Sequence, residues 1–378
     1  MMEIISTTFN HIKNIPGWRT NRKIVVFAVD DYGNVRVNSK KSFENISNKS
    51  SLKLERFDQF DTLETKEDLE MLFNVLTSVK DKNGNFAVFT PFAIPCNIDF
   101  ERLKQEGYES YKYELLPITF EKLSNLQPKA YLGAWKLWQE GLEKGLLRPE
   151  FHGREHFNLK YFEEKLMNKD PQLMLSLENR SLTNLGPYQY STIKWTAAFS
   201  FWDCYEDTKN FSNIIQDGLH SFKLVFGYKS KIFTPPARHF PEHLEGELIK
   251  WGLVAFDRPF FQRKHMGKGR YKYEFSKNGF NKRTQILDIV RNVVFEPTNS
   301  EIDHVGKALK QIEAAFFWNK PAIVSSHRVN YCGHIDPSNR KKGLKSLKIL
   351  LKEILKKWPD VEFLDMSSLI DIIYNDDK

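Results

Sequence analysis

The sequence is poor in cysteine: Cys96, Cys204 and Cys332 are its only three, and they lie far apart. An odd number of widely spaced thiols matches neither a disulfide framework nor the paired spacing of a zinc-binding motif, which favours a reducing compartment. The chain also lacks an apolar run near the roughly 18 residues of a membrane span. Residues 1–22 contain no continuous apolar core of a signal peptide. We therefore expect a cytoplasmic protein without an integral membrane segment.

A concentrated basic block is missing as well. The net charge of +8 comes from 56 Lys and Arg against 48 Asp and Glu, and the lysines are spread along the chain. Nucleic-acid-binding proteins gather such charge on one face or in a recognisable motif, and neither pattern is evident. We expect no nucleic-acid partner.

Aromatic residues are abundant, with 30 Phe, 14 Tyr and 8 Trp. Most of them fit a large core, although flat rings also pack on sugars. Tyr111, Tyr113, Trp135 and Trp138 lie in a long connection, residues 95–146, that has no strong strand pattern. Because connections of this length often cap a site, we predict that at least one of these rings forms a wall of a substrate cleft. The alternative is that they only pack the connection onto the rest of the fold.

Short apolar runs alternate with helical periodicity. Residues 23–29 and 86–91 have the continuous apolar pattern of strands buried on both faces. Further strands are expected at residues 146–152, 231–238, 253–257, 290–295, 321–326 and 361–365. Helices are expected at residues 66–79, 160–167, 207–225, 242–251, 301–318 and 341–357. This alternation, without a glycine-rich dinucleotide fingerprint, predicts an α/β fold: a distorted (β/α) barrel of seven or eight parallel strands. We expect a single domain, residues 1–378, with residues 95–146 as a cap-like insertion after the second strand.

Two basic segments have less specific patterns. Residues 263–283 are expected to form a surface loop. The helix over residues 341–357 has its apolar residues on one side and lysines elsewhere. That pattern is typical of the outer helix of a barrel, and contact with a membrane surface is the alternative.

Polar residues stand at or just after the carboxyl ends of the expected strands. They are Asp30, Asp31, His152, Arg238, Asp257 and His327. In a parallel barrel these strand ends converge on one face, where the chemistry of such folds takes place. The sequence therefore predicts that residues from most of the chain meet in one site.

His152 and His156 have a spacing that suits metal binding. If a helix begins near Gly153, both imidazoles lie on one face and can bind one divalent ion. The acidic pair at residues 30–31 could supply a third ligand. Spacing alone is weak support, because a second pair at residues 239 and 243 repeats it.

Three phrases of the sequence occur together in a known order. They are Val29-Asp30-Asp31-Tyr32-Gly33, His152-x-x-x-His156 and Ser326-His327-Arg328-Val329-Asn330-Tyr331. In order and context they resemble the polysaccharide deacetylase (NodB-homology, carbohydrate esterase family 4-like) family. Residues 149–158 and 358–363 are similar to a bacterial branch described only as deacetylase-like. The resemblance covers roughly residues 22–370, and the paired aspartates combined with the spaced histidines are its most specific part.

The resemblance implies a divalent metal held by Asp31, His152 and His156. Zn²⁺ is the metal it favours, with Co²⁺, Mn²⁺ and Ni²⁺ as alternatives. It further implies that Asp30 is the general base and His327 the general acid. The implied reaction removes N- or O-acetyl groups from a carbohydrate partner, either an oligo- or polysaccharide or its precursor.

Two positions depart from the family's pattern. Its third motif has an arginine before a Pro-Pro pair, which orients the catalytic aspartate, and a tyrosine after the pair. Here Thr234 and Ala237 occupy these positions, and Arg238 follows. Either Arg238 reaches the same carboxylate from a different position, as a catalytic residue, or Asp30 lacks this partner. Tyr32 also displaces the glycine that directly follows the acidic pair in the family.

Residues beside these motifs are candidates for contact with substrate. They are Tyr32, Asp257, Asn330 and Tyr331. Asp257 could equally cap a helix, and Asn330 and Tyr331 could equally serve a turn. Two other functions remain open: a related barrel hydrolase that cleaves another C–N bond of a small molecule, and a non-catalytic carbohydrate-binding barrel that retains the metal cluster.

Overall fold

The computed structural model describes residues 8–186, 189–190 and 192–376. Ten strands form its main sheet: β1 (Ile24–Tyr32), β2 (Phe89–Ala93), β5 (Glu150–Phe151), β6 (Ile232–Phe233), β7 (Ala255–Asp257), β10 (Gly279–Asn281), β11 (Ile286–Ile289), β12 (Val293–Val294), β13 (Ala322–His327) and β14 (Glu362–Phe363). Their spatial order is β10-β11-β7-β6-β5-β2-β1-β13-β12, and β14 pairs with β1 beside this path.

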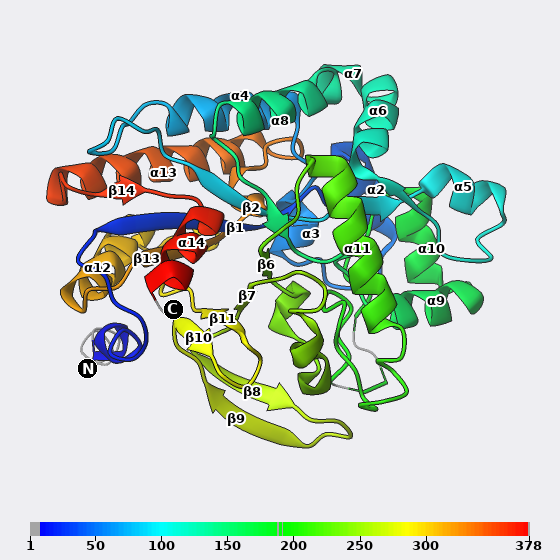
Figure 1. Cartoon of the computed structure of the whole chain (residues 1–378). Helices are drawn as coiled ribbons and strands as arrows, with labels where there is room; N and C mark the ends of the chain where they lie inside the picture. The colour runs from blue at the N-terminus through cyan, green and yellow to red at the C-terminus, as the bar shows by residue number, and fades with distance from the viewer. Residues whose placement is uncertain (1–7, 187–188, 191, 377–378) are drawn as a thin grey trace.

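The sheet is almost entirely parallel and curls into a half-barrel (Figure 1). The eight strands from β11 to β12 are parallel to their neighbours, and only β10 runs antiparallel. The expected distorted barrel of seven or eight parallel strands is thereby confirmed. The two ends of the parallel part of the sheet, β11 and β12, follow one another in the chain, since β11 ends at Ile289 and β12 begins at Val293.

Helices cover both faces of this sheet (Figure 1). They are α2 (Lys40–Lys49), α3 (Arg56–Phe60), α4 (Lys66–Leu76), α5 (Phe100–Gln105), α6 (Leu116–Leu126), α7 (Pro128–Tyr131), α8 (Ala134–Glu143), α9 (Leu159–Met167), α10 (Pro171–Glu178), α11 (Phe211–Phe226), α12 (His304–Phe317), α13 (Pro337–Lys357) and α14 (Met366–Asp376), with 3-10 turns η1 (Pro236–Arg238), η2 (Glu242–Glu247) and η3 (Arg328–Tyr331). None of the helices in the described ranges is long and apolar enough to cross a membrane. The lysine-rich helix α13 buries its leucines against the core, as expected of an outer helix.

Alternation along the strands divides the core into two parts. In β1, Val25 and Phe27 belong to the large cluster that packs under α4, α8, α11, α12 and α13. Val26 and Ala28 point the other way, into a smaller cluster that α14 covers with Met366 and neighbouring apolar residues. Successive strand residues face opposite sides of a sheet, so two layers can bury one continuous apolar strand. We call the side of the smaller cluster the inner face.

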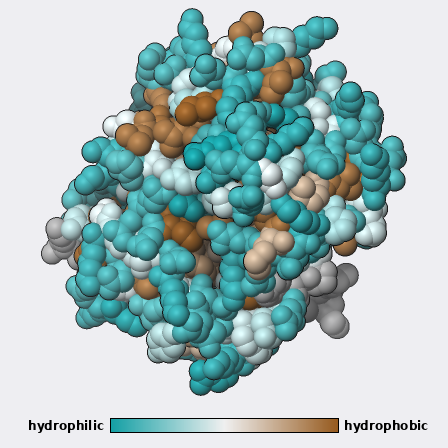
Figure 2. Space-filling view, turned by 90° about the vertical axis from the view of Figure 1, so that its right-hand side faces the viewer, coloured by the Kyte–Doolittle hydropathy of each residue, from teal (hydrophilic) through white to brown (hydrophobic). Residues whose placement is uncertain are grey.

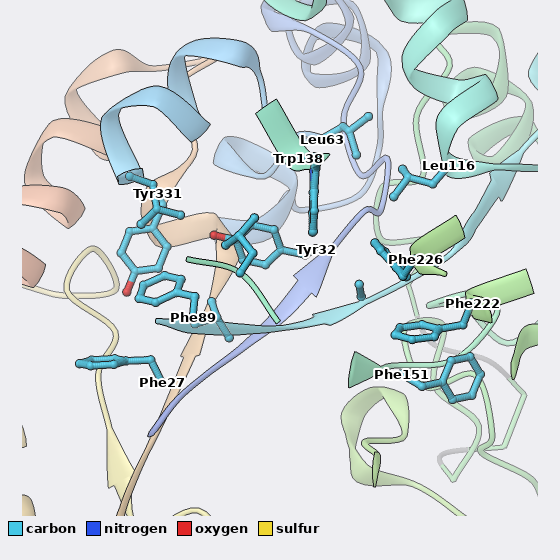
Figure 3. Close-up of a cluster of buried hydrophobic side chains, with 14 of the residues drawn as sticks. Phe27, Tyr32, Leu63, Phe89, Leu116, Trp138, Phe151, Phe222, Phe226 and Tyr331 are labelled. Atoms are coloured by element: carbon cyan, nitrogen blue, oxygen red, sulfur yellow. The ribbon is translucent and has the colours of Figure 1, made fainter. Parts of the chain in front are cut away.

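The long connection over residues 95–146 folds into helices α5 to α8 and a small hairpin, β3 (Cys96–Ile98) with β4 (Tyr113–Leu115). Its Trp138 is fully buried and meets Tyr32 edge to face at 5.8 Å between ring centroids (Figure 3). The indole N–H of Trp138 donates to Glu64 at 2.7 Å. Trp138, Tyr111 and Trp135 pack the connection onto the core, which is the alternative given above.

Three local expectations were wrong. Residues 242–251 do not form an α-helix, because only the 3-10 turn η2 lies there. Residues 263–283 are not an irregular loop, because they contain most of a β-hairpin, β8 (Phe261–His265) with β9 (Tyr271–Phe275), followed by β10. No helix begins near Gly153: residues 152–158 are irregular and α9 starts at Leu159.

The face of the molecule seen in Figure 2 is largely hydrophilic, and its apolar groups are small and separate.

Candidate active site and metal centre

The site is built from the inward-facing side of the strands, continued past their carboxyl ends. Ala28 lies in the inner core cluster, and Asp30 follows it after one two-residue step. The same step leads from Ile323 to Ser325 and His327, from Ile232 to Thr234, from Ala255 to Asp257 and from Ile289 to Arg291. Because a strand's period is two, each of these polar residues inherits the direction of the apolar residue before it.

Asp31 breaks this alternation. The pairing of β1 with β2 shifts register between Val29 and Tyr32, and Asp31 has a left-handed backbone with φ of 75°. Such a conformation costs a non-glycine residue roughly 1–2 kcal/mol. It brings Asp31 to the same cavity as Asp30, whereas two neighbours in a regular strand point to opposite sides. The strained bulge is therefore what places both aspartates in one site.

Asp31, His152 and His156 converge as the sequence predicts. Nε2 of His156 lies 2.9 Å from Oδ1 of Asp31, and Nε2 of His152 lies 3.4 Å from the same oxygen. The histidines reach this point from the end of β5 and from the following loop, where Gly153 adopts φ of 112°. A loop that doubles back, not a helical face, thus brings the two imidazoles together.

The chemistry of these groups fits a divalent cation. Nδ1 of His152 lies 2.7 Å from the carbonyl oxygen of Thr234 and must donate to it, so Nε2 keeps its lone pair for a ligand. Nε2 of His152 and Oδ1 of Asp31 are both buried, and neither has a hydrogen-bond partner in the part of the chain that the structure describes. One carboxylate and two neutral imidazoles are a ligand set typical of catalytic zinc, which keeps a fourth position open. These three residues could hold a metal.

Asp30 lies beside this group and has a different environment. The Arg291 guanidinium binds it with two hydrogen bonds of 2.7 and 2.8 Å and also lies 3.0 Å from Asp257. Burial by itself would raise the pKa of Asp30, but the positive charge of Arg291, with smaller effects of His152 and His327, lowers it. Asp30 is thus held ionised, as a base must be.

His327 faces Asp30 from β13. Its Nε2 lies 3.9 Å from Oδ2 of Asp30, and its Nδ1 lies 2.6 Å from Oε1 of Glu296. Burial alone would lower the pKa of His327, yet the Glu296 carboxylate, with smaller effects of Asp31 and Asp30, raises it to about 9. Glu296 is itself held by Arg56 and by the side-chain amide of Asn330, both at 2.9 Å. The imidazole is therefore held protonated, as an acid must be.

A cavity of about 410 Å³ opens onto these groups. One wall consists of strand-end residues: Asp30, Asp31, His152, Thr234, Ser325 and His327. A second part of the lining comes from the segment between β1 and α4 and contains Asn34, Arg36, Glu55, Phe57 and Asp61. Phe57 meets the ring of His327 edge to face at 5.4 Å. Among the described residues that line this cavity, none belongs to residues 95–146.

The four residues expected to contact substrate lie behind the cavity wall. Tyr32 and Tyr331 are buried in the aromatic core, where they pack on Trp138 and Phe89. Asn330 has no exposed surface and orients Glu296, while Asp257 lies beneath Arg291. None of the four is among the described residues that line the cavity. Their observed contacts are with other residues of the protein, and contact with substrate stays a prediction.

Arg291, and not Arg238, is the partner of Asp30. Arg238 lines the same cavity, but its nearest carboxylate is Asp257, with 3.7 Å from its Nε to Oδ2. Arg291 was missed because the sequence pattern predicted a strand over residues 290–295, which places Arg291 inside a strand. In the structure Arg291 follows the end of β11. The signal was present: Leu287, Ile289 and Arg291 are spaced like Val26, Ala28 and Asp30. Glu296, which follows β12 and holds His327, was missed too.

Comparison with known proteins adds no assignment. No protein-family model matches the sequence, and no curated protein matches it. Among solved structures, a Mycobacterium smegmatis protein assigned as a polysaccharide deacetylase is 10% identical with a TM-score of 0.43, and the match covers 96% of this chain and 93% of that one. PuuE allantoinase is 9% identical with a TM-score of 0.43, covering 94% and 91%. A branching enzyme of glycoside hydrolase family 57 from Thermococcus kodakaraensis is 12% identical with a TM-score of 0.44, covering 93% and 71%. The motif-level likeness to deacetylases remains a resemblance.

Proposed function

We propose that this protein is a metal-dependent hydrolase that removes N- or O-acetyl groups from a carbohydrate. The observation that supports it best is the pairing of two opposite proton-transfer groups at one metal-binding triad. Asp30 is held ionised by Arg291, and His327 is held protonated by Glu296. Groups whose environments push their pKa values apart are the usual base and acid of a hydrolytic site.

Asp31, His152 and His156 would hold the metal. A divalent cation there would polarise an acyl carbonyl and lower the pKa of water. Asp30, adjacent to the triad, accepts the proton of the attacking water. His327, on the other side of Asp30, donates a proton to the amine or alkoxide that leaves. Arg291 and Glu296 keep the two groups in the required protonation states before the reaction begins.

The cavity suits a small acyl group on a polar carrier. Its volume of about 410 Å³ lies within the range of small-molecule sites. Most of the lining residues are polar and offer hydrogen bonds to hydroxyl groups, and Phe57 and Pro235 supply apolar surface. Sugars present both kinds of surface.

The two adjacent aspartates provide the test. We expect Asp31→Asn to lose bound metal, because an amide is a poorer ligand than a carboxylate. We expect Asp30→Asn to retain metal while turnover of acetylated chito-oligosaccharides falls by about 10²–10⁴. Asp360→Asn, at an exposed aspartate paired with Lys23, is the matched control and should change neither property.

Metal content and turnover of the purified variants decide the matter. Loss of metal in Asp30→Asn but not in Asp31→Asn would invert the two roles. Metal binding without turnover of any acetylated sugar would favour a binding protein. Turnover of a cyclic amide or ureide in place of acetylated sugars would favour hydrolysis of another C–N bond.

A further inference from the structure

A second cavity, of about 230 Å³, lies next to the first. The two cavities share Ala237 and Arg238 in their walls, so the candidate active site continues past Arg238. The far wall of the second cavity is strand β8 of the hairpin, with Phe261, Arg263 and His265. The hairpin β8–β9 lies at the lower edge of the view in Figure 1.

The charge of the second cavity is opposite in sign to that of the first. Arg238, Arg263 and Lys264 line it, and none of its described lining residues is acidic. Lys264 is neutralised by Glu245, and Arg238 lies 3.7 Å from Asp257. Arg263 is exposed and stacks on Tyr271, with 3.8 Å from its guanidinium carbon to the ring centroid, and no carboxylate is paired with it in the described part of the chain. At least one full positive charge is thus available at this cavity.

Two buried groups in the wall have no hydrogen-bond partner among the described residues. The backbone N–H of Gly269 donates to Nε2 of His265 at 3.0 Å, so the proton of the neutral ring is on Nδ1. That Nδ1 is buried and unpartnered, and the residue as a whole is only 8% exposed. Burial lowers the pKa of His265, which favours this neutral form. The hydroxyl oxygen of Thr192, in the same wall, is also buried and unpartnered. Donors left unpaired cost about 1–3 kcal/mol each unless a ligand meets them.

The junction between the cavities is built in a strained conformation. Ala237 and Arg238 both have left-handed backbones, with φ of 53° and 57°. Such residues cost of order 1–3 kcal/mol each and cluster at ligand sites. The side-chain amide of Gln262, on β8, donates to the carbonyl of Arg238 at 3.2 Å and ties the hairpin to this turn. The turn thereby holds Arg238 at the boundary of both cavities.

We propose that the second cavity binds an anionic group, a phosphate or a carboxylate, carried by the same substrate whose acyl group enters the first cavity. This inference rests on the proposed function for the identity of the first group, and on the second cavity's own residues for the anion. Arg263 and Arg238 supply charge, and His265 and Thr192 supply neutral donors. The preferred substrate class is accordingly an acylated sugar with a charged substituent, bound more tightly than a neutral one.

The test measures binding apart from catalysis. Full-length protein is first freed of metal with a chelator, so that phosphate cannot bind a cation in the first cavity. Calorimetric titrations then compare N-acetylglucosamine, N-acetylglucosamine 1-phosphate and glucuronic acid. We expect a charged sugar to bind at least about tenfold more tightly than the neutral one, and the two charged probes distinguish phosphate from carboxylate.

Matched variants locate the binding site. Arg263→Gln and His265→Phe should each abolish most of this preference. Lys272→Gln removes a charge from the same hairpin outside the cavity and should bind like the wild type. Equal binding of neutral and charged sugars by the wild type would overturn the proposal, as would an equal loss in Lys272→Gln and Arg263→Gln. If charged sugars bind as expected and no acylated sugar is hydrolysed, the proposed function fails while the assignment of this cavity stands.

Discussion

Replacing Arg291 by methionine tests the central contact of the site. The guanidinium is 1% exposed and binds Asp30 twice, Asp257 at 3.0 Å and the hydroxyl of Thr234 at 3.2 Å. Methionine has a similar length but no charge and no donor. The variant therefore leaves two buried carboxylates, Asp30 and Asp257, without their shared cation.

The expected loss of stability is large. Removing one partner of a buried ion pair typically costs roughly 3–5 kcal/mol, because the other charge stays buried and unpaired. Here two carboxylates lose the same partner, so we expect a loss of about 4–5 kcal/mol. A domain is stable by only about 5–15 kcal/mol, and the change should be evident in any unfolding curve. Without Arg291 the pKa of Asp30 loses the largest effect that opposes burial and should rise, so turnover should fall by about 10²–10⁴ as the base is lost.

The assay is urea unfolding, followed by turnover of the folded fraction. Arg238→Met is the matched control: it removes an arginine near the same Asp257, but this side chain is 32% exposed. Its stability should change by less than about 1 kcal/mol. The double variant Asp30→Asn with Arg291→Met should regain part of the stability, since one unpaired charge is removed, but no turnover. If Arg291→Met were as stable as the control, or if it kept full turnover, the role given to Arg291 would be refuted.

Two further predictions concern stability outside the metal triad. Burial, with contributions from Lys194 and His265, lowers the pKa of His239 to about 4, so the folded state resists protonation that the unfolded chain accepts near its ordinary value. The free energy of unfolding should therefore fall as the pH drops below about 6.5, by about 2 kcal/mol at pH 5. Urea unfolding of His239→Gln should lack this part of the loss. An identical acid dependence in both proteins would contradict the prediction. A methyl group on Gly343 would lie 1.8 Å from the carbonyl oxygen of Asn330, so Gly343→Ala should cost about 1–3 kcal/mol and also lower turnover by displacing Asn330. Gly246→Ala, where a methyl group meets nothing within 4 Å, should do neither, and equal behaviour of the two variants in thermal unfolding would disprove the contact.

Much of the fold was predictable because buried parallel strands have a strong local signal. Residues 24–29, 253–257 and 321–326 are apolar runs, and each lies within or overlaps an observed strand. The candidate metal residues were predictable for a related reason, since polar groups directly after such runs meet at one end of a parallel sheet. Asp31, His152 and His156 lie together in the structure although long segments separate them in the chain.

What escaped prediction depends on contacts between distant segments. The β8–β9 hairpin has aromatic and basic residues on both strands, a pattern that looks polar and irregular when read alone. The wall of the cavity formed by Glu55 and Phe57 belongs to a segment without strand periodicity. The predicted helix at His152 and His156 was wrong, because a spacing of four residues fits a helix and also fits a loop that turns at a glycine with positive φ. Periodicity identifies elements, but it cannot tell which irregular segment lies over them.

The incomplete closure of the barrel explains why Arg291 stands where it does. Three residues, Val290, Arg291 and Asn292, separate β11 from β12 and cross between the two ends of the parallel part of the sheet. Asn292 takes over backbone pairing there: its side-chain oxygen accepts from the N–H of Ile323 at 2.8 Å, and its amide donates to the carbonyl of Pro321 at 2.9 Å. Arg291, on the inner face, joins Asp30 of β1 to Asp257 of β7, strands on either side of the gap. In a closed barrel a further strand pair would stabilise this position. Here a buried charge network does so, and the same guanidinium that joins the two sides holds the candidate base ionised. Stability and proton transfer should therefore change together in every Arg291 variant, whereas Asp30→Asn, which leaves the pairing with Asp257 in place, should lose turnover with a smaller loss of stability.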